Sequence, residues 1–158
     1  MSDKQMTAVT QDSKVTLREV TKETVRTICD LKVSESQNKF VAPNAVSIAQ
    51  AYFHEVAWFR AIYADDTPVG FLMLHKDTEK PEYFLWRMMI DERYQRMGFG
   101  YKAMELLIDY VKGLPKASEL LTSCVPGEGS PEDFYNKLGF ARNGEMEDDE
   151  VVMSLSLE

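Results

Sequence analysis

The stretch RMMIDERYQRMGFGYKAMELLIDYVK, residues 87–112, decides the fold of this chain of 158 residues. It opens at the end of an apolar and aromatic run, YFLWRMMI (residues 83–90), in which Arg87 is the single charge. Such a run predicts a central strand that is covered on both faces. The pattern then changes to apolar side chains along one stripe, which predicts an amphipathic helix over residues 100–113.

The turn between this strand and this helix, QRMGFG at residues 95–100, has a chemical use. The first turn of a helix carries N–H groups without intrahelical partners and the positive end of the helix dipole, so it binds anions. Gly98 and Gly100 remove side chains where a phosphate would approach the backbone, and Arg93 and Arg96 add positive charge. We predict a pyrophosphate site here, although an isolated Gly-x-Gly more often serves only a tight turn.

Gly98, Gly100 and Ala103 also match the dinucleotide-binding fingerprint G-x-G-x-x-A. That fingerprint requires an acidic residue about 20 residues later, at the end of the next strand. Here Glu119 precedes its strand, and only 58 of the 158 residues follow Gly100, too few for the rest of a doubly wound fold. The dinucleotide interpretation is therefore rejected.

The segments before residue 87 predict one strand, two helices and a hairpin. A strand begins near Val15, Thr21 caps a first helix, and Asn44 caps a second helix whose apolar stripe reaches Phe53. WFRAIY (residues 58–63) and PVGFLMLH (residues 68–75) then form an antiparallel hairpin. Residues 1–13 are polar and aperiodic, and we expect a loosely held arm.

After the central helix the sequence predicts a strand, a short helix and a terminal hairpin. ELLTSCV (residues 119–125) is the strand, and Ser130 caps a helix that has Pro131 at its first position and Gly139 after its end. The complete order of elements predicts a single domain over residues 1–158 with a mixed α/β sheet.

Composition excludes some classes of function. The chain has 18 Lys and Arg against 26 Asp and Glu, a net charge of −8. This charge disfavours nucleic acid and favours a cationic partner. No apolar run approaches the about 18 to 20 residues of a membrane span, so we expect a cytoplasmic protein without a membrane partner, and a homodimer is one option. Cys29 and Cys124 lack paired spacing, and we expect both to be reduced, buried and structural.

Two motifs resemble those of the GNAT superfamily of N-acetyltransferases. QRMGFG matches the acetyl-coenzyme A signature Q/R-x-x-G-x-G/A at every defined position, and FYNKLGF (residues 134–140) is similar to the second signature. The order of elements is also that of the family, so the resemblance runs from about Val15 to the C-terminus. Residues 31–53 and 59–74 look like the bacterial spermine/spermidine, or diamine, acetyltransferase branch.

The resemblance implies a mostly antiparallel sheet of about seven strands flanked by four helices and splayed between strands 4 and 5. Acetyl-coenzyme A would be the cosubstrate, with its pantetheine arm along the fourth strand and its pyrophosphate on the glycine turn. Tyr135 corresponds to the family tyrosine beside the thioester, where a phenol of pKa about 10 can protonate a thiolate. The implied binding residues are Met88, Met89, Ile90, Gln95, Arg96, Met97, Gly98, Phe99, Gly100 and Tyr101.

The resemblance also implies a small cationic amine as acceptor, such as spermine, spermidine or a diamine. An amine is mostly protonated at pH 7 and needs a base before it can attack. Candidates for substrate binding or base are Glu35, Glu55, Glu82 and His54, although each is more often a solvated surface residue.

Other features of the sequence depart from the family or play no part in this site. Where animal polyamine acetyltransferases carry an acidic pair on the fourth strand, this chain has Trp86 and Arg87. The acidic residues 145–150 are interpreted as a solvated hairpin tip and His75 as structural, and we predict no metal site. Another amine acceptor (a peptide N-terminus, an amino acid or an aminoglycoside) and a nonenzymatic acyl-coenzyme A sensor remain alternatives.

Overall fold

The computed structural model describes residues 8–158, apart from the side chains of residues 39 and 40. Seven strands form one sheet in the order β1-β2-β3-β4-β5-β7-β6. All neighbouring strands are antiparallel except β4 and β5, which are parallel. The strands are β1 (Val15–Arg18), β2 (Ala57–Ala64), β3 (Thr67–Asp77), β4 (Glu82–Ile90), β5 (Glu119–Cys124), β6 (Ala141–Glu147) and β7 (Glu150–Ser156).

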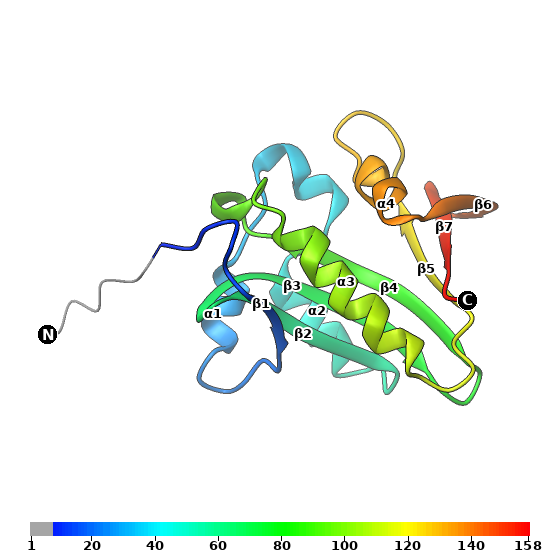
Figure 1. The fold of residues 1–158 in the computed structure, drawn as a ribbon, viewed down its shortest axis with the longest axis horizontal. Helices are drawn as coiled ribbons and strands as arrows, with labels where there is room; N and C mark the ends of the chain where they lie inside the picture. The colour runs from blue at the N-terminus through cyan, green and yellow to red at the C-terminus, as the bar shows by residue number, and fades with distance from the viewer. Residues whose placement is uncertain (1–7) are drawn as a thin grey trace, which may run out of the picture.

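Within residues 8–158, four α-helices flank the sheet, as the resemblance implies. They are α1 (Val25–Asp30), α2 (Asn44–Ala51), α3 (Phe99–Lys112) and α4 (Glu132–Leu138), with short 3₁₀ helices η1 (Glu35–Phe40) and η2 (Glu92–Tyr94) between them. Helix α3 covers one face of strands β2 to β4, and α1 and α2 lie on the other face (Figure 1). Between residues 8 and 158, none of the helices combines the length and apolar character that a bilayer crossing requires.

Strand β3 carries the core on both of its faces. Leu72 and Leu74 pack in the cluster that includes α3, whereas Phe71 and Met73 pack in the cluster that includes α1. The two-residue period of a strand puts alternate side chains on opposite faces and so divides the core in two. The sequence predicts such double coverage for β4, but in the structure Trp86, Arg87 and Met88 of this strand stay half-buried.

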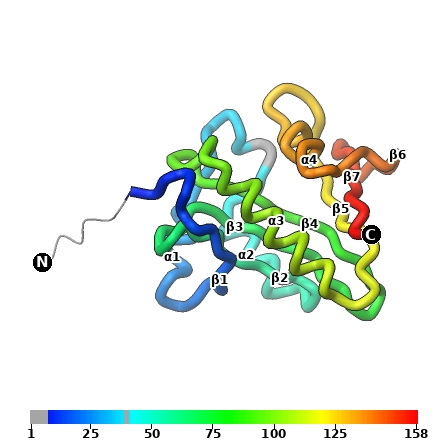
Figure 2. The backbone as a smooth tube through the Cα atoms, in the orientation of Figure 1, coloured from blue at the N-terminus to red at the C-terminus, as the bar shows by residue number. Residues whose placement is uncertain are grey.

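Strands β4 and β5 are paired over only part of their length. Their register holds two pairs, Phe84 with Leu121 and Leu85 with Thr122. A bulge against β3 follows at once, because Leu74 is opposite Leu85 and Met73 is opposite Arg87, which leaves Trp86 as an extra residue. The traces of the two strands run side by side near the C-terminus of the chain and diverge from there (Figure 2). The splay between strands 4 and 5 is confirmed.

Helix α2 begins and ends differently from the prediction. Pro43, not Asn44, is the cap residue of α2; the Asn44 side chain is buried and its Nδ2 donates to the Ile28 carbonyl at 2.9 Å. Helix α2 ends at Ala51, and the exposed fractions of Tyr52 and Phe53 are 85% and 79%. The Asn44 amide does not cap α2, because it forms a hydrogen bond with α1 instead. This bond joins α1 to α2.

The starts of α1 and α4 are also shifted along the chain. Thr24 is the cap residue of α1, where the sequence predicts Thr21, and its hydroxyl accepts the Thr21 N–H at 2.9 Å. At α4, Pro131 takes the cap position, while the Ser130 hydroxyl accepts the Glu132 N–H at 3.2 Å. Both hydroxyls therefore satisfy N–H groups beside the helix start.

Residues 8–13 of the expected arm are attached to the domain. Thr10 N–H donates to the Ser13 hydroxyl at 2.9 Å, Ser13 is buried, and Lys102 of α3 donates to the Gln11 carbonyl. The other seven residues of the arm lie outside the described residues. Of the two free cysteines, Cys124 is buried as expected, whereas Cys29 is only half-buried because it faces a small side pocket beside Pro43.

Candidate active site

A cleft of about 990 Å³ opens where β4 and β5 diverge. Its walls come from five parts of the chain: the end of β4, the turn into α3, the end of β5 with α4, the segment before α2, and the turn between β6 and β7. The predicted residues that line it are Met88, Met89, Ile90, Gln95, Arg96, Gly98, Phe99, Gly100, Tyr101 and Tyr135. Of the residues predicted to bind the coenzyme, Met97 alone does not line it; its side chain packs against the core instead.

The glycine turn presents open backbone to this cleft. Gly98 is the cap residue of α3 with a φ of 83°, a left-handed conformation that favours glycine. Among the residues that the structure describes, no side chain caps the helix, and a Cβ built on Gly98 would meet no atom within 4 Å. The N–H groups of the first turn of α3 are therefore free of side-chain partners, at the positive end of a helix of 14 residues.

Two polar side chains, the buried Asp91 and the half-buried Gln95, hold this turn in place. Asp91 has an exposed fraction of 1% and accepts the N–H of Lys32 at 3.0 Å and that of Arg93 at 2.9 Å. Gln95 donates through Nε2 to the Ile90 carbonyl at 2.9 Å and to Gln37 at 2.8 Å. These bonds tie the end of β4 and the turn after it to the segment before η1, through Lys32, and to η1 itself, through Gln37.

The positive charge at the turn is arranged differently from the prediction. Arg93 forms an ion pair with Asp91, with 2.8 Å between Arg93 Nε and Asp91 Oδ1. Arg93 does not line the cleft. Burial raises the pKa of Asp91, but the hydrogen bonds from Arg93 and Lys32 outweigh it, and the net pKa is lowered. Arg96 lines the cleft together with Lys137 of α4, which the sequence analysis missed.

Tyr135 stands in the apolar wall of the cleft. Its ring centroid lies 5.4 Å from that of Phe134 and 5.6 Å from that of Phe140, and its exposed fraction is 6%. Burial raises the pKa of Tyr135 to about 12, with a further rise from the charges of Cys124 and Glu150, against a lowering by the Thr122 side chain. The phenol therefore keeps its proton at neutral pH and can donate it in a hydrogen bond.

Cys124 lines the cleft beside this tyrosine, which raises the question of a covalent acetyl intermediate. Burial raises the pKa of the Cys124 thiol. Since the thiolate is the nucleophile, a thiol held protonated is a poor acyl acceptor.

The bulge in β4 brings Arg87 to the cleft beside Trp86. The guanidinium donates to the Trp86 carbonyl at 3.2 Å and to Gln50 of α2 at 3.1 Å, and it lies 5.1 Å from the Trp86 ring centroid. Its Nε is buried without a hydrogen-bond partner among the described residues. Burial lowers the pKa of Arg87, and the charge of Glu150 acts in the opposite direction.

Two carboxylates of the acidic segment also line the cleft, Asp149 and Glu150. The sequence analysis interpreted the whole segment as a solvated hairpin tip, and Glu145, Glu147 and Asp148 are indeed exposed. Glu150 is half-buried: burial raises its pKa, as do Asp149 and Glu147, while Arg87 and Ser123 lower it. The register of β7 on β5 brings Glu150 to the cleft. Cys124 is opposite Val151, so Glu150, the residue before Val151, lies at the open end of β5.

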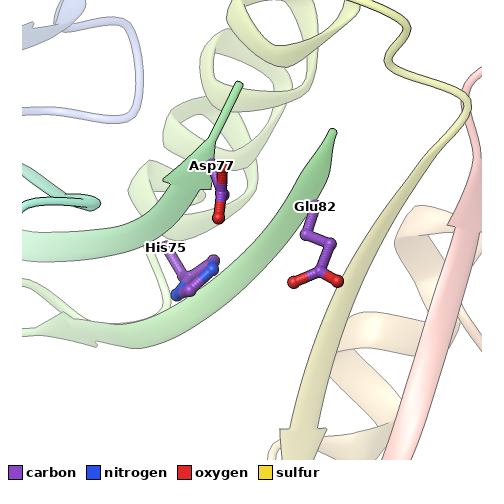
Figure 3. Close-up of side chains that lie close together, drawn as sticks. All are labelled: His75, Asp77 and Glu82. Atoms are coloured by element: carbon purple, nitrogen blue, oxygen red, sulfur yellow. The ribbon is translucent and has the colours of Figure 1, made fainter. Parts of the chain in front are cut away.

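The acidic candidates for substrate binding do not gather at this cleft. Glu35, Glu55 and Glu82 are exposed and none of them lines it. His54 is also exposed, and its ring packs edge-on against Trp86 with centroids 5.2 Å apart. Glu82 lies at the other end of β4, beside His75 and Asp77 (Figure 3).

The fold and the cleft agree with comparisons to known proteins. Residues 25–140 match the model of the acetyltransferase (GNAT) family. The chain belongs to this family of acetyltransferases. It is 28% identical to a spermine/spermidine N(1)-acetyltransferase of Bacillus subtilis over 141 residues, which cover 84% of this chain and 91% of the relative. A probable spermine N(1)-acetyltransferase of Bacillus subtilis subsp. natto is 26% identical over the same shares.

Several solved structures share the fold. A domain from Methanocaldococcus jannaschii has a TM-score of 0.73 at 14% identity and covers 92% of this chain and 99% of its own. The ribosomal-protein-S18-alanine N-acetyltransferase of Escherichia coli has a TM-score of 0.67 at 17% identity, with coverage of 92% and 95%. PaiA N-acetyltransferase from Thermoplasma acidophilum, solved in complex with coenzyme A, has a TM-score of 0.63 at 14% identity, with coverage of 90% and 99%.

Proposed function

We propose that this acetyltransferase moves the acetyl group of acetyl-coenzyme A directly to a primary amine of a small polycation, such as spermine, spermidine or a diamine. Family membership supports acetyl transfer, and the names of the two Bacillus relatives support a polyamine acceptor. The observation that carries the proposal is that the unpaired edge of β4, the open first turn of α3 and Tyr135 all meet in one cleft.

Acetyl-coenzyme A fits this cleft by its chemistry. The pyrophosphate would bind the amides of residues 95–101, where Gly98 offers bare backbone and Arg96 supplies charge. The pantetheine arm carries amides of its own, which would pair with the β4 edge near Met88, Met89 and Ile90 as an added strand does. In this arrangement the thioester would lie toward Tyr135.

The acceptor would enter from the side of Trp86 and Glu150. A cation is drawn to Asp149 and Glu150 within a chain of net charge −8. Glu150, whose pKa is raised, is suited to accept the ammonium proton. The neutral nitrogen would then attack the carbonyl carbon, so that the C–N bond forms and the C–S bond breaks, while Tyr135 donates a hydrogen bond to the departing thiolate. The second proton lost from the nitrogen ends on this thiolate, which gives the amide and the free thiol of coenzyme A.

Arg87 favours a second candidate acceptor, an amine that also carries a carboxylate, such as an amino acid. A guanidinium with an unpartnered Nε in a cleft wall suits a carboxylate and repels a second ammonium. In this alternative Glu150 would hold the amine and Arg87 the carboxylate. The two candidates differ only in what lies at the far end of the substrate.

A matched pair of substrates, cadaverine and 5-aminopentanoate, distinguishes the two candidate acceptors. Thiol release from acetyl-coenzyme A is measured with spermidine, with cadaverine, and with 5-aminopentanoate, in which a carboxylate replaces one amine of a similar chain. The polyamine proposal predicts saturable release with spermidine and cadaverine and little with the amino acid. The reverse order supports the second candidate, and coenzyme binding without release for any amine supports the sensor alternative.

Homodimer formation, the cytoplasmic location and the lack of nucleic-acid or membrane partners stay predictions.

A further inference from the structure

Three side chains with metal-binding atoms lie together at the end of the β3–β4 hairpin, away from the cleft. His75 and Asp77 end β3, and Glu82 begins β4 (Figure 3). One ligand atom from each of the three lies within 4.8 Å of the other two. His75 and Asp77 are half-buried and Glu82 is exposed, so the cluster is open to solvent on one side.

The hydrogen-bonded ladder of the hairpin fixes these positions. The period of a strand puts His75 and Asp77 on the same face, and the register pairs Asp77 directly with Glu82. One carboxylate oxygen of Asp77 accepts the N–H groups of Glu79 at 3.1 Å and Lys80 at 3.0 Å. Among the described residues, the other carboxylate oxygen accepts no hydrogen bond and is available to a ligand.

The two carboxylates stand opposite each other without a protein cation between them. Like charges directly opposite on neighbouring strands destabilise a sheet. Among the described residues, none of the salt bridges involves Asp77 or Glu82. Lys76, between His75 and Asp77, is turned to the other face, where its Nζ donates to the Tyr110 hydroxyl at 2.9 Å. A bound cation would remove this repulsion.

We propose that His75, Asp77 and Glu82 bind a divalent transition-metal ion of the Zn²⁺ type, with water completing the coordination. One imidazole nitrogen and two carboxylate oxygens suit Zn²⁺, whereas Mg²⁺ and Ca²⁺ prefer oxygen ligands alone. Ligand atoms around Zn²⁺ lie roughly 3–4 Å apart, so small side-chain rotations are enough to close the site. The ion clamps the start of β4 to the end of β3 and stabilises the hairpin.

The test is calorimetric titration of the full chain with ZnCl₂, after removal of any tag and treatment with a chelator. The proposal predicts one saturable site and a rise in Tm with zinc. His75→Ala and Glu82→Gln should each weaken binding by roughly tenfold or more. His54→Ala is the matched control, because the chain holds only two histidines, and it should bind as the wild type does.

A second readout identifies the ligand directly. In an NMR titration with Co²⁺, the imidazole signals of His75 should shift or broaden while those of His54 stay in place. Glu82 is exposed, so Glu82→Gln is expected to fold even if another variant does not. Absence of a zinc-dependent heat, unchanged binding in His75→Ala, or loss of binding in His54→Ala would each overturn the proposal.

Discussion

At the scale of single residues, Tyr135 shows how its surroundings decide the chemistry of a side chain. A solvated phenol has a pKa of about 10. The apolar wall formed with Phe134 and Phe140 removes water and raises the pKa of Tyr135 to about 12. In the proposed reaction, a group this weakly acidic would act by donating a hydrogen bond to a developing thiolate, since full proton transfer to sulfur would be uphill.

Replacing Tyr135 by Phe tests that role. Turnover should fall by roughly 10²- to 10⁴-fold, because the sulfur loses its donor, while the apolar wall and the affinity for acetyl-coenzyme A stay nearly unchanged. The measurement is kcat by thiol release together with coenzyme affinity by calorimetry. Since the pKa of Tyr135 lies near 12, wild-type turnover should show no loss from tyrosine ionisation up to about pH 9. Equal turnover in both proteins would remove the role.

At the scale of elements, the bulge in β4 and the short pairing with β5 create the cleft. A regular β4 would alternate its side chains and continue its pairing with β5. The extra residue at Trp86 puts Arg87 on the same side as Trp86 and leaves the last residues of β4 unpaired toward β5. One inserted residue thus provides both the open edge and the polar wall.

Gly70 of β3 leaves room for the backbone at the end of β4. It is opposite Ile90, and a Cβ at this position would collide with the Met89 carbonyl and approach Ile90 Cδ1 to 2.8 Å. Gly70→Ala should therefore destabilise the domain by about 1–3 kcal/mol, because backbone has to move. Gly113→Ala, where the nearest atom stands at 3.5 Å and φ is −84°, should change stability little. Urea unfolding measures both, and equal midpoints would contradict this account.

At the scale of the whole molecule, the cleft lies between two parts of one sheet. Strands β1 to β4 with α1 to α3 form one part, and β5 to β7 with α4 form the other (Figure 1). The first part supplies the glycine turn, and the second supplies Tyr135 and Glu150. The site is therefore complete only when both parts are folded together, and Asp91 is the buried charge that anchors the turn in the first part.

Asp91 makes stability depend on pH. Against the rise from burial, hydrogen bonds from Arg93 and Lys32 lower its folded pKa below the ordinary value of an aspartate, so its contribution is present above that ordinary value and is lost as pH falls through the folded pKa. Asp91→Asn should cost about 2 kcal/mol at pH 7, because charged hydrogen bonds are lost, and should cost less near pH 3. Urea unfolding at the two pH values measures this. A cost that is equal at both would contradict the charge-based account.

The sequence predicted the order of elements and the glycine turn because both depend on local patterns. It predicted Tyr135 through a motif, but the rise of its pKa depends on Phe134 and Phe140 closing around it. Glu150 and Arg87 were not assigned to the cleft, because a bulge and a strand register bring them there. The cluster of His75, Asp77 and Glu82 likewise has no spacing motif, since a hairpin assembles it.

The central claim is that the turn at residues 95–101 binds the pyrophosphate of acetyl-coenzyme A through its backbone. A Cβ at Gly100 would have ordinary contacts, 3.5 Å from Ile90 and Phe134 and 3.6 Å from Met88, so Gly100→Ala fits, whereas Gly100→Leu has to extend into the cleft. Calorimetric titration with acetyl-coenzyme A should give saturable binding to the wild type, near-normal binding to Gly100→Ala, and affinity at least roughly tenfold weaker for Gly100→Leu. No heat with the wild type, or full affinity in Gly100→Leu, would contradict the account.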